Sequence, residues 1–155
     1  MAMTLSIMPI ARLVLHPIWR VTRGLTLGVR GVARDGAGQV LLVRHSYAPG
    51  WMFPGGGVER GDTLEVALAR EFEEEVGLTV EERPRLFGVY ANFDAFPGDH
   101  VALFVVDGWR GSPRGSFEIA EWGFFDPEGL PEGTTAGTRR RLAELNGNAQ
   151  RDPMW

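Results

Sequence analysis

The feature that most constrains this chain is a glycine-rich loop, "PGGGVERGD", that runs directly into an amphipathic, glutamate-rich helix. The helix is predicted from Thr63 to Val76, with Asp62 or Thr63 as its N-cap and Gly77 at its end. Apolar residues recur at i, i+4 steps and predict a stripe that is buried against a core: Leu64, Leu68, Phe72 and Val76.

The acidic residues of this helix, "EFEEE", carry charges of one sign at close spacing. Each helical residue turns by about 100°, so Glu71, Glu74 and Glu75 share a face that borders the buried stripe, whereas Glu73 points to solvent. Their repulsion costs roughly a few tenths of a kcal/mol per pair on an exposed face, and more at the edge of a core, where water screens less. Two interpretations stay open: a solvated acidic face, or a site for a hard divalent cation such as Mg²⁺.

The glycines before the helix allow the backbone unusual dihedral angles and close approach to a ligand. Gly55, Gly56 and Gly57 precede the helix by a few residues, so a backbone carbonyl can join the carboxylates around one metal ion. A flexible turn is the alternative interpretation.

The rest of the chain predicts a mixed sheet flanked by helices, because strands, one helix, more strands and a second helix follow one another. The first two strands are expected to pair as a hairpin around "DGAGQ", and the next two to be joined by a Pro-Gly turn. The predicted strand segments are 25–35, 39–45, 83–95, 99–111 and part of 117–131, and the second helix is 135–147.

The chain has 155 residues, which predicts one main domain. Residues 1–24 are expected to form an N-terminal helical segment that packs on the domain or on a second subunit, and the second arrangement would give a homodimer. Attachment of this segment to a membrane surface is the alternative. Residues 25–148 are the expected domain and residues 149–155 a flexible tail.

Composition excludes several classes of function. A net charge of −4 gives no reason to expect a nucleic acid polymer as partner. The absence of Cys excludes disulfides, thiolate metal sites and a Cys nucleophile, and it fits a cytoplasmic location. No apolar run approaches the length of about 20 residues that spans a bilayer.

The loop and helix together match a long motif of fixed spacing. From Gly56 the chain reads G-x5-D-x7-R-E-F-x-E-E-x-G-L, ending at Leu78. This resembles the Nudix box, G-x5-E-x7-R-E-U-x-E-E-x-G-U with U an apolar residue. Asp62 stands where the family usually has glutamate. The flanking segments "GWMFPGGGVE" and "AEWGFFDPEGLP" are also similar to those of many members.

The resemblance implies an α/β fold, the Nudix-type α/β/α sandwich around a mixed β-sheet. It implies metal-dependent hydrolysis, with Mg²⁺ or Mn²⁺, of the pyrophosphate bond in a nucleoside diphosphate linked to another group. By matching position, Glu71, Glu74 and Glu75 are the expected metal ligands, joined by the Gly56 carbonyl, and Arg70 orients a carboxylate. The shorter side chain of Asp62 leaves its role open.

The general base is less constrained by the motif. It can be Glu74 or Glu75, or else Glu118 or Glu121 from the acidic segment that follows the box. A polar strand face or a capping contact is the alternative role for the latter two.

Substrate contacts are expected from the segments that flank the box. Arg44 is the candidate for a phosphate contact, and Tyr47, Trp51 and Phe93 are candidates for stacking on a base, although such aromatics can equally pack in the core. No added motif selects one small nucleotide derivative over another. A non-hydrolytic sensor that keeps the fold and binds a nucleotide is the competing hypothesis.

Overall fold

The computed structural model of the protein describes residues 24–155. The expected N-terminal helical segment therefore lies outside the described residues, except for Gly24. The central sheet joins β1 (Thr26–Ala33), β5 (Asp99–Val106) and β4 (Arg85–Ala91) in the order β1-β5-β4. β1 runs parallel to β5, whereas β4 and β5 pair antiparallel, as predicted for two strands joined by a Pro-Gly turn.

The predicted hairpin between the first two strands is wrong. β2 (Val40–His45) pairs antiparallel with β7 (Ile119–Phe125), and only an isolated bridge between Arg34 and Val40 joins it to the end of β1. The reason is that β1 pairs along its whole length with the apolar strand β5. β5 is distant in sequence, so a local turn motif cannot indicate this pairing. β3 (Thr79–Val80) and β6 (Trp109–Arg110) form a short separate ribbon.

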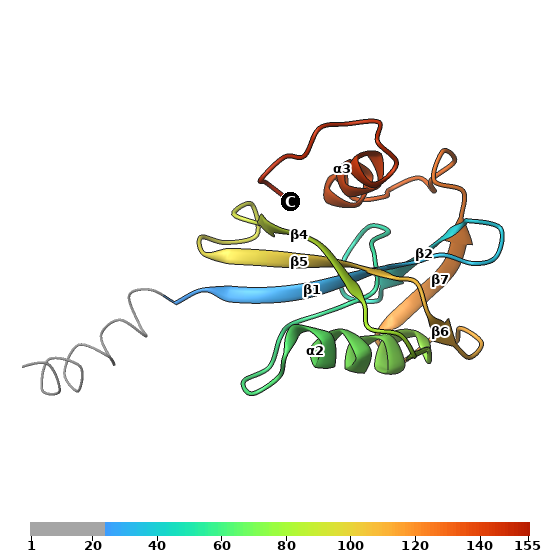
Figure 1. The fold of residues 1–155 in the computed structure, drawn as a ribbon. Helices are drawn as coiled ribbons and strands as arrows, with labels where there is room; N and C mark the ends of the chain where they lie inside the picture. Colours follow the sequence, from blue (N-terminus) through green and yellow to red (C-terminus); the bar gives the residue numbers. More distant parts are fainter. Residues whose placement is uncertain (1–23) are drawn as a thin grey trace, which may run out of the picture.

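Two helical layers cover opposite sides of the sheet (Figure 1). On one side, α2 (Leu64–Glu71) continues into the π-helical turn η1 (Phe72–Val76); on the other lies α3 (Ala136–Leu145). Thr63 is the N-cap of α2, because its Oγ1 accepts from the Val66 N–H at 3.2 Å. Gly77 ends the helix with a φ of 67°, a conformation that favours glycine. The predicted helix is thus confirmed.

The sheet separates two cores, which makes the molecule an α/β/α sandwich. Leu41 and Val43 of β2 face the α2 side, whereas Val40 and Leu42 face the α3 side, as expected when successive side chains of a strand point to opposite faces. The predicted stripe of α2 packs into the first core, with Leu68, Phe72 and Val76 fully buried and Leu64 partly buried. The glutamate face that borders this stripe is thereby fixed beside the sheet.

The C-terminal segment, expected to be a flexible tail, is packed against the domain in the structure. The Ala91 N–H donates to Pro153 O at 2.9 Å, and the Trp155 N–H donates to Ala91 O at 2.8 Å. Arg141 of α3 also donates to Met154 O at 2.8 Å. Within residues 24–155, no helix has the length and apolarity needed to cross a membrane.

Candidate active site

The glycine loop lies along the edge of β1 that β5 leaves open. The Val29 N–H donates to Gly56 O at 2.8 Å, and the Gly31 N–H donates to Pro54 O at 3.0 Å. Gly55 has a φ of 141°, and any side chain there would collide with the backbone of β1. A Cβ on Gly56 would lie 2.6 Å from the carboxylate carbon of Glu71. The loop is therefore a closely packed support for the acidic helix, and the glycines are needed for that close approach.

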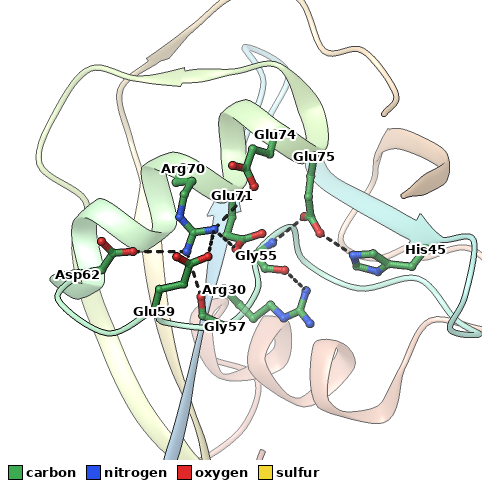
Figure 2. Close-up of polar contacts among 10 residues, drawn as sticks. All are labelled: Arg30, His45, Gly55, Gly57, Glu59, Asp62, Arg70, Glu71, Glu74 and Glu75. Atoms are coloured by element: carbon green, nitrogen blue, oxygen red, sulfur yellow. Dashed lines mark hydrogen bonds and ion pairs between the residues drawn. The ribbon is translucent and has the colours of Figure 1, made fainter. Parts of the chain in front are cut away.

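Arg70 and Glu71 meet directly beside this loop (Figure 2). Arg70 Nη1 lies 2.8 Å from Glu71 Oε1, and its other terminal nitrogen donates to Gly57 O at 3.2 Å. Three further carboxylates surround the same guanidinium at longer range: Asp62 at 3.5 Å, Glu59 at 3.6 Å and Glu74 at 3.7 Å. Asp62 thus keeps an ionic contact with Arg70, and Glu59 adds a second one nearby.

Glu75 is held from the opposite side. Its side chain is 5% exposed; His45 Nε2 lies 2.5 Å from Oε1, and the Gly55 N–H donates to Oε2 at 2.8 Å. Arg30 of β1 lies close by and donates from Nη1 to Phe53 O at 3.0 Å and to Gly55 O at 2.8 Å. Burial lowers the pKa of Arg30, and the negative charge of Glu75 opposes that change.

Burial and the neighbouring acids raise the pKa of Glu71 above its ordinary value. Burial is the main cause and the negative charge of Glu75 comes next, whereas Arg70 acts in the opposite direction. Glu74 is the open member of the set, with a side chain 61% exposed. The acids therefore carry negative charge that Arg70 only partly offsets.

Two hollows that share part of their lining border these residues. The acid hollow, about 160 Å³, is lined by Glu71, Glu74, Glu75, Ser116, Phe117 and Glu118. The main hollow, about 480 Å³, shares Glu71, Glu75 and Glu118 with it. Its other lining includes Arg30, Tyr47, Asn92, Phe96 and the three glycines. A side hollow of about 290 Å³ shares Arg30 and Asn92 with the main hollow and reaches Arg140 and Trp155 beside α3.

The donor set of the acid hollow suits a hard divalent cation, since it consists of carboxylate oxygens and Mg²⁺ prefers oxygen ligands. In the part of the chain that the structure describes, no three acidic or histidine side chains already meet at one point. Arg70 holds Glu71, while His45 and Gly55 hold Glu75. The Gly56 carbonyl accepts only from Val29 among these contacts, which leaves it one lone pair. The residues fit a metal by their chemistry and by the negative charge they accumulate.

Several predicted site residues do lie around these hollows. Glu71, Glu74 and Glu75 line the acid hollow, and Gly56 and Tyr47 line the main one. Glu118 borders both hollows. Arg70 lies behind Glu71 as the residue that orients it.

Four predicted residues are not brought to these hollows. Arg44 and Glu121 form an exposed ion pair across β2 and β7 at 2.7 Å, so each satisfies the other. Trp51 packs edge-on against Phe125 beside the core on the α3 side, because part of its large apolar surface is buried there. Phe93 packs edge-on against His100, and Phe96 of the same loop lines the main hollow instead.

The sequence motifs did not indicate that Arg30 and His45 belong to the site. Arg30 interrupts the apolar strand "TLGVRGVA", and His45 closes the buried run "VLLVRH". A charged or polar side chain in an otherwise buried strand is the signal that could have found them, since such groups are buried only with partners.

Comparisons with known proteins agree with this arrangement. A family model described as the NUDIX domain matches residues 24–145. An ADP-ribose pyrophosphatase from Methanocaldococcus jannaschii is 33% identical over 126 residues, which cover 78% of this chain and 69% of that protein. An 8-oxo-dGTP diphosphatase from Escherichia coli is 34% identical over 100 residues, covering 59% and 74%. The solved structure of a MutT NUDIX hydrolase from Burkholderia pseudomallei aligns with a TM-score of 0.69 at 29% identity, over 77% of this chain and 97% of that one.

Proposed function

Because this chain belongs to the NUDIX family of pyrophosphohydrolases, we propose that it hydrolyses the diphosphate bridge of a nucleoside diphosphate linked to another group. The observation that carries this proposal is the acid hollow: three glutamates of the helix and Glu118 border one small space, which shares lining residues with a larger hollow bordered by Arg30. A diphosphate in the main hollow would lie between the acids and this arginine.

NUDIX hydrolases generally use divalent metal ions, and we assign that role here to Mg²⁺ or Mn²⁺. Glu71, Glu74 and Glu75 would hold the ion together with the Gly56 carbonyl, since all four lie around the hollows. When bound, the metal neutralises phosphate charge and makes water a better nucleophile. Arg70 keeps Glu71 oriented through the 2.8 Å ion pair.

Glu118 is the general base that the geometry favours. It borders both hollows and comes from the segment before β7, outside the crowded helix. Glu75 is already engaged by two partners, and Glu121 is paired with Arg44 away from the hollows. A general base must reach the proton of the attacking water, and Glu118 lines the hollow that the proposed metal ligands border.

The main and side hollows would each hold a different part of the substrate. Arg30 and Asn92 border both spaces, so the diphosphate would lie beside them, and one linked group would extend toward Arg140 and Trp155. Tyr47 and Phe96 offer aromatic surface for the other group. ADP-ribose and 8-oxo-dGTP, the substrates in the names of two relatives, are the first compounds to test. No contact described in the site favours the non-hydrolytic sensor.

The test is an activity screen of purified protein with Mg²⁺ and with Mn²⁺ over nucleoside diphosphate derivatives, dinucleotides and nucleoside triphosphates. ³¹P NMR of products formed in ¹⁸O-water would identify the phosphorus that is attacked. Glu118→Gln is expected to lower kcat by about 100-fold or more, the usual contribution of a general base. Glu121→Gln, an exposed acid on the same segment, is expected to retain kcat.

Two outcomes would contradict the proposal. Release of no phosphate product across the whole screen would remove the hydrolase assignment. A loss of kcat in Glu121→Gln with normal kcat in Glu118→Gln would leave the reaction class intact and move the base to the other glutamate.

A further inference from the structure

We infer that His45 is a positioning residue for Glu75, fixing its carboxylate in the orientation that takes a divalent cation. The inference rests on the proposed metal-dependent function and adds to it a residue outside the box motif. Figure 2 shows His45 approaching Glu75 from the side opposite Arg70.

The inward direction of His45 follows from the alternation of side chains along β2. Arg44 lies opposite Glu121 on β7, but His45 lies opposite Ile119, so the register shifts between these two residues. The extra residue, Ala120, belongs to β7, and bulges of this kind are frequent next to active sites. Here Arg44 forms an exposed ion pair, while the His45 side chain turns inward and is 3% exposed. His45 therefore points to the same face of β2 as the buried Val43, which places its imidazole in the interior beside Glu75.

The contact with Glu75 uses only part of its carboxylate. His45 Nε2 lies 2.5 Å from Oε1, and the Gly55 N–H donates to Oε2 at 2.8 Å. Each carboxylate oxygen can accept more than one such contact, so both oxygens keep acceptor capacity. The two partners come from β2 and from the glycine loop, and together they fix the carboxylate plane.

The other two glutamates are held differently. Glu71 is bound by Arg70, its neighbour in sequence, and Glu74 is 61% exposed with Arg70 at 3.7 Å. Glu75 alone among the three is buried and held by partners from outside its own helix. Partners of this kind orient metal ligands, and their removal typically weakens metal binding by about 10- to 100-fold.

A packing role alone does not account for a histidine at this position. His45 Nδ1 is buried and has no hydrogen-bond partner in the described residues. An unpaired buried polar atom is destabilising, so an apolar side chain would pack at lower cost. Only a polar side chain of about this length can make the contact that His45 Nε2 makes with Glu75.

The experiment measures Mn²⁺ affinity at one fixed pH, by titration calorimetry and by the electron paramagnetic resonance signal of free Mn²⁺. His45→Leu is expected to weaken Mn²⁺ binding by about 10- to 100-fold. His45→Gln, whose amide nitrogen can take the place of Nε2, is expected to restore most of the affinity. His45→Asn, whose amide matches Nδ1, is expected to restore less. Thr138→Val, a buried polar site in α3, is the control and should bind Mn²⁺ as the unmodified protein does.

Melting temperatures in excess EDTA separate positioning from folding, and the Gln and Asn variants carry the comparison if the Leu variant does not fold. Equal or tighter Mn²⁺ binding by His45→Leu, or equal affinities of the Gln and Asn variants, would overturn the inference. So would a lack of Mn²⁺ binding by the unmodified protein. If that protein binds Mn²⁺ but hydrolyses nothing, the proposed function fails while the affinities of the variants still decide the role of His45.

Discussion

At the scale of single residues, the site is a balance of carboxylates and the few groups that offset them. Arg70 has four carboxylates within 4 Å, from Glu59, Asp62, Glu71 and Glu74. Glu75 depends instead on His45 and the Gly55 N–H. The chain tolerates its acidic helix because each buried carboxylate has a partner, although these partners leave excess negative charge.

Removing the negative charge of Glu75 is expected to change the pKa of Glu71. That pKa is raised by burial and then by Glu75, so Glu75→Gln is expected to lower it toward the ordinary value while burial keeps it above. Because the pKa of Glu71 is higher in the folded than in the unfolded protein, this group stabilises the fold fully only below its unfolded-state pKa, about 4.3. That stabilisation is lost as the pH rises through the folded-state pKa. Carboxyl ¹³C NMR of metal-free protein measures the pKa. Glu73→Gln, on the exposed face, should leave it unchanged; an unchanged value in Glu75→Gln would refute the coupling.

At the scale of elements, the contact between β1 and α2 decides where the glutamates lie. Gly31 of β1 packs directly against the ring of Phe72, which is fully buried, and a Cβ there would collide with that ring. Leu68 closes the same contact, with its Cδ1 3.1 Å from the position of that Cβ. The absence of a side chain at Gly31 therefore lets the acidic helix approach the sheet closely.

Gly31→Ala is expected to destabilise the protein by about 1–3 kcal/mol, the usual cost of overpacking a core, because Phe72 has to shift. Gly36→Ala is the matched control, since a Cβ there meets nothing within 4 Å, and its effect should stay within about 0.5 kcal/mol. Urea unfolding measures both free energies. Equal values for the two variants would show that the ring moves aside at no cost.

At the scale of the whole molecule, the C-terminal segment joins α3 to the edge of the sheet. Arg141 is fully buried: it lies 2.7 Å from Glu144 Oε1, donates to Met154 O and lies 3.9 Å above the ring of Tyr90. Trp155 packs edge-on against the same tyrosine and lines the side hollow. The end of the chain thus forms part of the proposed substrate-binding surface.

Arg141→Met is expected to lower the free energy of unfolding by about 3–5 kcal/mol, because it leaves the buried Glu144 without its cationic partner. Arg140→Met, the exposed neighbour on α3, should change it by less than about 0.5 kcal/mol. Denaturant unfolding gives the values, and limited proteolysis reports whether the C-terminal segment is released. A small effect of Arg141→Met, with the segment still protected, would show that the backbone pairing with Ala91 suffices.

The sequence by itself determined what lies within one continuous segment. The capped helix, its buried stripe and the shared face of Glu71, Glu74 and Glu75 follow from helical geometry, which fixes the relative directions of residues a few positions apart. The α/β class followed from the order of the elements, and the motif gave the family that the comparisons show.

Only the tertiary structure decided which distant segments meet. It paired β1 with β5 instead of β2, brought Arg30 and His45 to Glu75, and packed Trp51, partly buried, against the second core. It also paired Arg44 with Glu121 outside the hollows. Local spacing carries no information on these outcomes, because each depends on competition among distant partners for burial and hydrogen bonds, and that competition is resolved only when the layers pack.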